Sequence, residues 1–176
     1  MDIIGVHQTH CAFALAALIN AAYRGNDGAG RWTSEFGLIA GDRISITAVT
    51  DMILSAQVRL FAIFDADDAP RACIAVTLSD CVAEIGTFAV RPEEQGRGLG
   101  SRLLHHAERY ALKHAHTLRV CVVNHSGKLI DFYARRDYRL SDQPQPYPNH
   151  SLVGTPLVDG INLVVMEKLA TKFNTI

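Results

Sequence analysis

Apolar residues recur along the first half of this chain in patterns that predict one helix and then a series of strands. Residues 11–24 are rich in Ala and Leu and end at Arg24-Gly25, which is typical of a helix closed by a glycine. Thr50 or Asp51 is expected to cap a short second helix that ends at Ser55. Three apolar runs then predict strands, at 58–64, 72–78 and 81–90. The polar residues 65–70 indicate a hairpin between the first two runs.

In the second half the spacing changes to one apolar residue every three or four positions, starting at Leu99 and continuing to about His116. This spacing predicts an amphipathic helix. Further elements are expected at 118–123 (strand), 126–136 (helix) and 161–166 (strand), and the proline-rich residues 143–148 are expected to form a loop. A strand, helix, strand, helix order after a meander predicts an α/β fold with a mixed sheet and at least one parallel βαβ step. With 176 residues, no repeat and no linker, residues 1–176 are expected to form a single domain.

Composition and charge exclude several classes of protein. The chain is 48% apolar and carries a net charge of -1, so it can bury a core and does not have the composition of a disordered protein. A pI near 6.7 disfavours a module with a wholly basic surface, and no nucleic-acid partner is expected. The apolar run at 11–19 is too short to span a bilayer and lacks a basic leader, which predicts a cytoplasmic protein without a membrane partner.

Cysteine and histidine spacing gives no sign of a metal site. The four cysteines form no C-x-x-C pair and have no histidine at zinc-ligand spacing, so they are interpreted as small buried apolar residues in a reducing compartment. Most of the eight histidines are expected on the solvated surface. We therefore expect no bound metal.

The most informative stretch joins the predicted strand 81–90 to the helix that starts at Leu99. Pro92 ends the strand, and Gly96, Gly98 and Gly100 lead directly into the helix. Glycines allow a tight turn, and the first turn of a helix presents unpaired N–H groups at the positive end of its dipole. This arrangement suits a phosphate or pyrophosphate. The alternative is a flexible turn with solvated arginines.

The spacing of the glycines excludes two common nucleotide-binding motifs. A dinucleotide fingerprint would need a third glycine at position 101 or 103, which are Ser101 and Leu103. A P-loop would need Gly-Lys followed by Ser or Thr, and this tripeptide does not occur. The remaining pattern is Gln-x-x-Gly-x-Gly, formed by Gln95, Gly98 and Gly100.

In its context this pattern resembles the coenzyme A-binding motif of the GNAT N-acetyltransferase superfamily. The resemblance extends from about residue 83 to 140 and includes the strand, the loop, the helix, the next strand, Asn124 and the Phe132-Tyr133 pair. It implies a central sheet of six to seven mostly antiparallel strands, a parallel pair that splays at the cofactor cleft, and helices on both faces. It also implies acetyl-CoA as co-substrate and direct transfer of an acetyl group to a primary amine of a small molecule or peptide.

By the same resemblance, the loop amides hold the pyrophosphate, backbone groups of the preceding strand bind pantetheine, and an amide near Phe88 polarises the acetyl carbonyl. Asn124 matches an asparagine that binds pantetheine, although it could also cap a helix. The implied cofactor-binding residues are Phe88, Ala89, Val90, Gln95, Gly96, Arg97, Gly98, Leu99, Gly100, Ser101 and Asn124.

Two residues are candidates for catalysis. Tyr133 matches a tyrosine that protonates the departing thiolate, and the alternative is a packed tyrosine bonded to a neighbouring carbonyl. Glu84 is the candidate base for the acceptor amine, directly or through water, and the alternative is a carboxylate that faces solvent. Because residues 84, 86, 88 and 90 should share one face of a strand, Glu84 is expected on the side of Phe88, about 13 Å away.

The resemblance places the acceptor between the N-terminal helices and the late loops. Aromatic rings and a carboxylate there would suit an amine, and the candidates are Tyr23, Trp32, Glu35 and Tyr147. Edge strands and the late loop could also pair with a second copy, giving a homodimer. Two rival hypotheses remain: a non-catalytic acyl-CoA sensor with the same fold, and a phosphate- or nucleotide-binding module unrelated to acyl transfer.

Overall fold

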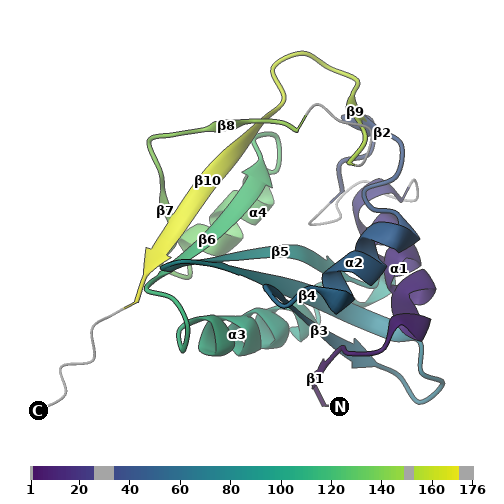
Figure 1. The fold of residues 1–176 in the computed structure, drawn as a ribbon. Helices are drawn as coiled ribbons and strands as arrows, with labels where there is room; N and C mark the ends of the chain where they lie inside the picture. The colour runs from purple at the N-terminus through teal and green to yellow at the C-terminus, as the bar shows by residue number, and fades with distance from the viewer. Residues whose placement is uncertain (1, 26–33, 149–152, 171–176) are drawn as a thin grey trace, which may run out of the picture.

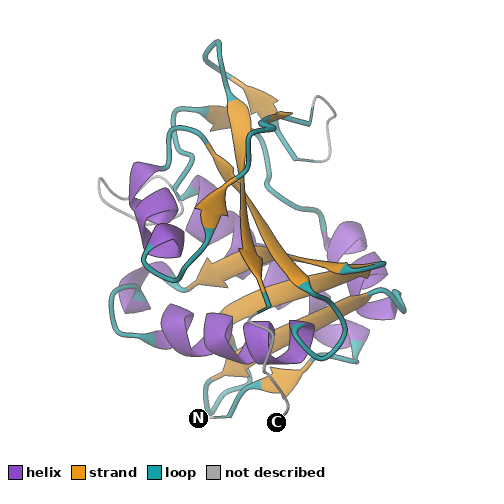
Figure 2. Ribbon diagram, turned by 90° about the vertical axis from the view of Figure 1, so that its left-hand side faces the viewer, coloured by secondary structure: helices purple, strands orange, loops and turns teal. Residues whose placement is uncertain are grey.

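The computed structural model describes residues 2–25, 34–148 and 153–170. These residues form a twisted central sheet with helices on both faces (Figures 1 and 2). Seven strands follow the order β1-β3-β4-β5-β6-β10-β7, and an eighth, β8, pairs with β10. Their bounds are β1 Ile4–Gly5, β3 Val58–Phe64, β4 Pro70–Ser79, β5 Val82–Val90, β6 Thr117–Val123, β7 Arg139–Leu140, β8 Gln145–Pro146 and β10 Asn162–Leu169. The predicted fold class is confirmed, and the described residues hold more strands than expected because β1, β7 and β8 have only two residues each.

Four α-helices are found in the described part of the chain. On one face of the sheet α1 (Ala12–Arg24) lies beside α2 (Ile46–Leu54), and α3 (Leu99–Ala111) lies against the other face (Figure 1). The fourth, α4 (Gly127–Ala134), follows β6. Two 3₁₀ turns, Thr9–Cys11 and Pro92–Glu94, and a small sheet of β2 (Ile39–Ala40) and β9 (Thr155–Pro156) complete the described elements. None of the helices in the described ranges is long and apolar enough to cross a membrane.

The strands at the centre of the sheet are apolar on both faces because helices cover both. Along β3, Phe61 and Ile63 pack in the core under α3, whereas Leu60 and Ala62 pack under α1 and α2. Side chains of a strand point alternately to the two faces, so a sheet covered on both sides reads as a continuous apolar run. This explains why the strand predictions at 58–64 and 72–78 agree closely with β3 and β4.

Three boundaries differ from the sequence expectations. Helix α2 begins after Ser45, whose Oγ accepts a hydrogen bond from the Ala48 N–H at 3.1 Å, so the expected caps Thr50 and Asp51 are wrong. Helix α3 ends at Ala111 rather than near His116, because the chain reverses there to bring the His116 N–H to the carbonyl of Cys81 at 2.9 Å. In the proline-rich segment, Gln145–Pro146 pairs with the edge of β10, a position that tolerates proline.

The parallel pair of the sheet opens after three residues. β5 and β6 are in register at Val82↔Thr117, Ala83↔Leu118 and Glu84↔Arg119. Beyond this point β5 stays paired with β4 up to Val90, and β6 stays paired with β10 up to Val123. The two strands therefore diverge within one sheet, which confirms the predicted splay and creates a cleft between them.

A bulge in β5 changes which side chains face this cleft. Ala75 of β4 lies opposite Gly86, and Cys73 lies opposite Ala89, so β4 has one residue where β5 has two, Thr87 and Phe88. Thr87 has a φ of 48°, in the left-handed region that β-branched residues rarely adopt. An extra residue in one strand interrupts the two-residue alternation of side chains.

The bulge makes the expected orientation of Glu84 wrong. Ala83 and Ile85 pack in the core under α3, so Glu84 between them points to the opposite face. After the bulge, Phe88 and Val90 pack in that same α3 core. Glu84 and Phe88 therefore lie on opposite faces of β5 rather than on the same one.

Candidate active site

The predicted glycine loop forms one wall of a groove of about 310 Å³ beside α3 and α4. The residues that line this loop groove are Phe88, Val90, Gln95, Gly96, Gly98, Gly100, Ser101, Leu129, Phe132, Arg135 and Arg136. Seven of the predicted cofactor-binding residues are thus brought together in one place. Its wall combines apolar rings, backbone of the glycine loop and two arginines.

Left-handed backbone at two glycines shapes the loop. Gly96 has a φ of 78° and Gly98 a φ of 84°, and only glycine adopts these angles without strain. Gly98 is also the N-cap of α3, and no side chain caps this helix end. The N–H groups of the first turn have no acceptor within the helix, so they are available to an anion in the loop groove.

A different glycine, Gly100, brings α3 close to β5. A Cβ at this position would lie 3.1 Å from Cζ of Phe88, closer than most side chains tolerate. The absence of a side chain lets the first turn of α3 approach the end of the strand. This contact holds the helix N-terminus next to the splayed part of β5.

Charged side chains fix the loop from behind. The Arg71 Nε donates to both carboxylate oxygens of Glu94 at 2.8 Å, and Arg91 forms an ion pair with Asp65 at 3.0 Å. The Gln95 Nε2 donates to the carbonyl of Val90 at 3.2 Å. The Arg71 guanidinium lowers the pKa of the nearly buried Glu94 carboxyl. The segment before the glycines is therefore tied to β4 and β5.

Replacing the Glu94 carboxylate is expected to make the stability of the fold depend less on pH. Because the pKa of Glu94 is lowered in the folded protein, its contribution is present above about pH 4.3, the ordinary range of Glu, and is lost as the pH falls through the lowered pKa. Glu94→Gln is expected to lower the Tm by about 3–6 °C at pH 7. The difference from wild type should shrink below about pH 4. Thermal melts between pH 3 and 8 measure this, and a difference independent of pH would contradict the role of the ion pair.

Arg136 is a groove residue that the sequence analysis missed. Its guanidinium carbon lies 3.7 Å from the centre of the Phe132 ring, and its Nη2 donates to Ser101 Oγ at 2.8 Å. It therefore joins α4 to the start of α3 and places a positive charge across from the glycine loop. A signal was present, since Arg135-Arg136 follows the aromatic pair after a single alanine, but only the fold shows that α4 faces the loop.

Other predicted cofactor residues do not line the loop groove. The side chains of Ala89 and Leu99 are buried in the two cores, and the side chain of Arg97 is exposed and does not line the groove. Asn124 Nδ2 donates to the carbonyl of Gly160 at 2.9 Å, which fixes the start of β10. The cap of α4 is Ser126, so the alternative of Asn124 as helix cap is wrong, and its binding of pantetheine stays a prediction.

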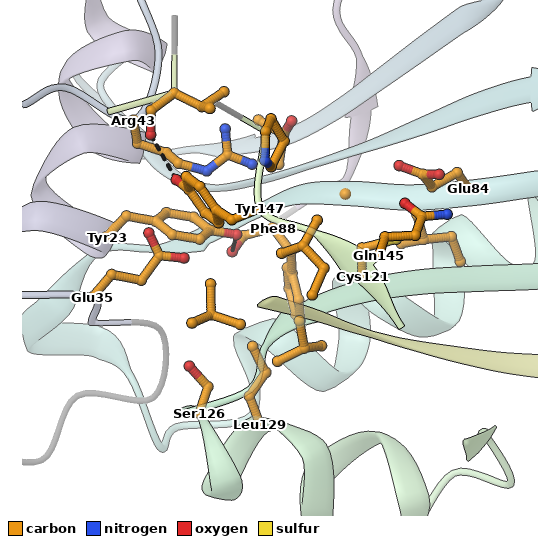
Figure 3. Close-up of a pocket in the computed structure, with 18 of the residues that line it drawn as sticks. Tyr23, Glu35, Arg43, Glu84, Phe88, Cys121, Ser126, Leu129, Gln145 and Tyr147 are labelled. Carbon is orange, nitrogen blue, oxygen red and sulfur yellow. Dashed lines mark hydrogen bonds between the residues drawn. The ribbon is translucent and has the colours of Figure 1, made fainter. Parts of the chain in front are cut away.

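A second cavity of about 260 Å³, here the acceptor pocket, is lined by the diverging parts of β5 and β6 (Figure 3). Its walls come from α1, β5, β6, α4 and the loops around β8. It brings together five of the six residues predicted for catalysis or acceptor binding, namely Tyr23, Glu35, Glu84, Tyr133 and Tyr147. The sixth, Trp32, lies outside the described residues. Phe88 and Leu129 line both cavities, so the acceptor pocket and the loop groove meet there.

Tyr23 and Tyr133 both line the acceptor pocket. Tyr133 is buried, and burial raises the pKa of its hydroxyl well above the ordinary range, so the side chain keeps its proton at neutral pH. Tyr23 donates its hydroxyl to the carbonyl of Phe88 at 3.2 Å, and burial raises its pKa to about 12. Both hydroxyls are thus neutral donors, and Tyr23 fixes the backbone of the bulge.

Two polar residues of the acceptor pocket, Glu35 and Tyr147, are bonded to other groups of the protein. Glu35 forms a nearly buried ion pair with Arg24, and the Tyr147 hydroxyl donates to the carbonyl of Val153 at 2.7 Å. Arg43, which is not among the predicted acceptor residues, has its guanidinium carbon 5.2 Å from the centre of the Tyr23 ring. Arg43 was not predicted as an acceptor residue, because only the fold brings it into the pocket, from a loop 20 residues after Tyr23.

The cysteines differ in burial. Cys73 is buried, Cys11 and Cys121 are half-buried, and Cys81 is exposed at the turn before β5, so the expectation that all four are buried is wrong. Cys121 lines the acceptor pocket, and burial raises the pKa of its thiol to about 11, which keeps it protonated and a weak nucleophile. Within the ranges described, no three His, Cys, Asp or Glu side chains cluster to hold a metal ion.

Comparison with known proteins agrees with this geometry. Residues 32–138 match the family model described as the acetyltransferase (GNAT) family, which spans more than half of the chain. A comparison with curated proteins finds no match.

Solved structures share the fold at low sequence identity. The ribosomal-protein-S18-alanine N-acetyltransferase from Escherichia coli superposes with a TM-score of 0.69 at 16% identity, covering 99% of this chain and 97% of that one. The PaiA N-acetyltransferase from Thermoplasma acidophilum, in complex with coenzyme A, gives 0.67 at 17%, covering 97% and 100%. A mutant of the spermidine N-acetyltransferase SpeG from Vibrio cholerae gives 0.65 at 14%, covering 96% and 95%.

Proposed function

Because the chain belongs to the GNAT family of acetyltransferases, we propose that it transfers the acetyl group of acetyl-CoA to a primary amine of a small molecule or peptide. The observation that carries the proposal is the meeting of two different cavities at Phe88 and Leu129. One has a loop suited to phosphate groups, and the other has carboxylates and aromatic rings suited to an amine. A thioester that reaches the junction from the loop groove would meet an amine from the acceptor pocket.

The residues of the loop groove fit coenzyme A. The N–H groups of the uncapped first turn of α3 can donate hydrogen bonds to the pyrophosphate, and Arg135 and Arg136 supply positive charge. Phe88, Val90 and Phe132 give an apolar surface for the pantetheine arm. At Gly96 and Gly98 a Cβ would meet nothing within 4 Å, so the backbone is open to a ligand. The co-substrate supplies an activated acyl thioester, and the chain supplies position and proton transfer.

In the proposed reaction the amine nitrogen attacks the thioester carbonyl, an amide forms and the C–S bond breaks. Tyr133 donates a proton, or a strong hydrogen bond, to the departing sulfur, which its protonated state allows. Glu84 removes a proton from the acceptor amine. Since Glu84 and Phe88 point to opposite faces of β5, this transfer runs through water rather than by direct contact. No covalent intermediate on the enzyme is needed.

A coupled assay tests the proposal. Purified protein is mixed with acetyl-CoA and a panel of amines, amino acids and short peptides, and release of the free thiol is measured together with the mass of the product. We expect amide formation with at least one acceptor and one thiol released per amide. Tight binding of acetyl-CoA with no thiol release from any acceptor would favour the non-catalytic sensor instead.

A further inference from the structure

The charges that line the acceptor pocket are not all compensated, and this limits what the pocket can bind. Its charged lining residues are Glu35, Arg43 and Glu84. Glu35 is neutralised by Arg24, and both side chains are about nine-tenths buried, with exposures of 8% and 10%. Arg24 also donates to the carbonyls of Gly41 at 2.9 Å and Val153 at 2.8 Å. The Glu35 carboxylate is therefore held in the wall of the pocket by its ion pair with Arg24.

Arg43 brings a positive charge that no carboxylate balances within the described part of the chain. Its backbone is fixed by Asn20 of α1, whose Oδ1 accepts from the N–H of Arg43 at 2.8 Å and of Ile44 at 3.1 Å. The guanidinium is held over the Tyr23 ring. A fixed, half-buried guanidinium gains most from an anion that satisfies its planar set of N–H donors.

Glu84 carries the opposite charge, and it too has no ion pair among the residues described. Its neighbour across the parallel pair, Arg119, instead donates to Glu167 at 2.7 and 2.9 Å. Figure 3 shows Arg43 and Glu84 on opposite sides of the pocket. The acceptor pocket therefore has a positive side and a negative side.

We infer that the acceptor is a compact amino acid whose carboxylate binds Arg43 while its amine lies between Glu84 and the junction at Phe88. This inference rests on the proposed function. The pocket, at about 260 Å³, is at the small end of ligand sites. A carboxylate matches the guanidinium with two parallel hydrogen bonds. A diamine or polyamine would instead place an ammonium group against Arg43, which is unfavourable.

Matched acceptors test the inference. The substrates are L-amino acids and the amines that remain when each carboxylate is removed, together with the corresponding aminoalkyl phosphonates and short peptides. The wild-type protein is expected to prefer amino acids over the decarboxylated amines by about 10- to 100-fold in kcat/KM. This is the usual contribution to binding of a hydrogen bond between charged groups in a partly buried site. A preference for phosphonates or for peptides would overturn the assignment of a free amino acid.

Arg43 variants show whether this residue reads the carboxylate. Arg43→Gln is expected to raise the KM for amino acids by about 10- to 100-fold with little change for the decarboxylated amines or acetyl-CoA. Arg43→Lys should restore part of the loss, and Arg139→Gln, on an exposed edge strand, is the matched control. If decarboxylated amines react equally well and Arg43→Gln leaves the ratio unchanged, the inference fails while the proposed function stands. If nothing is acetylated, both fail.

Discussion

Tyr133→Phe is expected to lower kcat by about 100-fold or more, the usual range for loss of a general acid. The substitution removes only the hydroxyl, and the ring keeps its edge contacts with Phe132 and Tyr138, whose ring centres lie 5.3 Å away. The Kd for acetyl-CoA should therefore stay within about twofold, because Tyr133 lines the acceptor pocket and not the loop groove. Steady-state kinetics combined with a binding titration separates the two quantities.

Tyr138→Phe provides the matched control for this experiment. Tyr138 is as buried as Tyr133 and stands in the same aromatic cluster, but it lines neither cavity. Its loss of a hydroxyl should leave kcat unchanged. Equal effects of the two substitutions would mean that Tyr133 acts through packing. An unchanged kcat in Tyr133→Phe would remove its role as the acid.

Gly98→Val is expected to weaken acetyl-CoA binding by about 30-fold or more. At a φ of 84° a β-branched residue is strained by about 1–2 kcal/mol, so the loop would move towards ordinary backbone angles. That movement turns the first N–H groups of α3 away from the groove. Calorimetric titration with acetyl-CoA gives the Kd directly, and kcat at saturation should change much less.

Gly37→Val is the control for backbone strain alone. Gly37 has a φ of 76°, also with no atom within 4 Å of a built Cβ, and it lies outside both cavities. This variant should lose a similar amount of stability without losing affinity. Similar Kd values for the two variants would show that the glycine loop does not hold the ligand.

Sequence patterns predicted the elements well where a local signal and the tertiary structure agree. The strands β3, β4 and β6 were predicted within two residues because both faces of the sheet are covered. The end of α3 was missed because Ala115 continues the apolar spacing and packs in the same core, although the helix has already ended at Ala111. The cap Ser45 was missed because no Glu or Gln follows at the third helical position, which is Ala48.

In the candidate site, too, residues marked by a local sequence pattern were predicted, and residues brought together only by the fold were missed. The glycine loop was found because its spacing is local, and the structure places Gln95, Gly98 and Gly100 together as expected. The prediction that Glu84 and Phe88 share a face of β5 was wrong because of the bulge at Thr87. A threonine gives no sequence signal for a bulge, and one extra residue reverses the direction of every later side chain of the strand. The places of Arg43 and Arg136 in the two cavities could not be predicted, since only folding brings their segments there.

A calorimetric comparison of three ligands tests whether the loop groove is an acyl-CoA site. The protein is titrated in turn with acetyl-CoA, ATP and NAD under one set of conditions. We expect a one-to-one complex with acetyl-CoA at least about tenfold tighter than with either nucleotide, because the groove provides both an anion site and an apolar surface for pantetheine. Equal or tighter binding of NAD would contradict the assignment of the groove to an acyl-CoA.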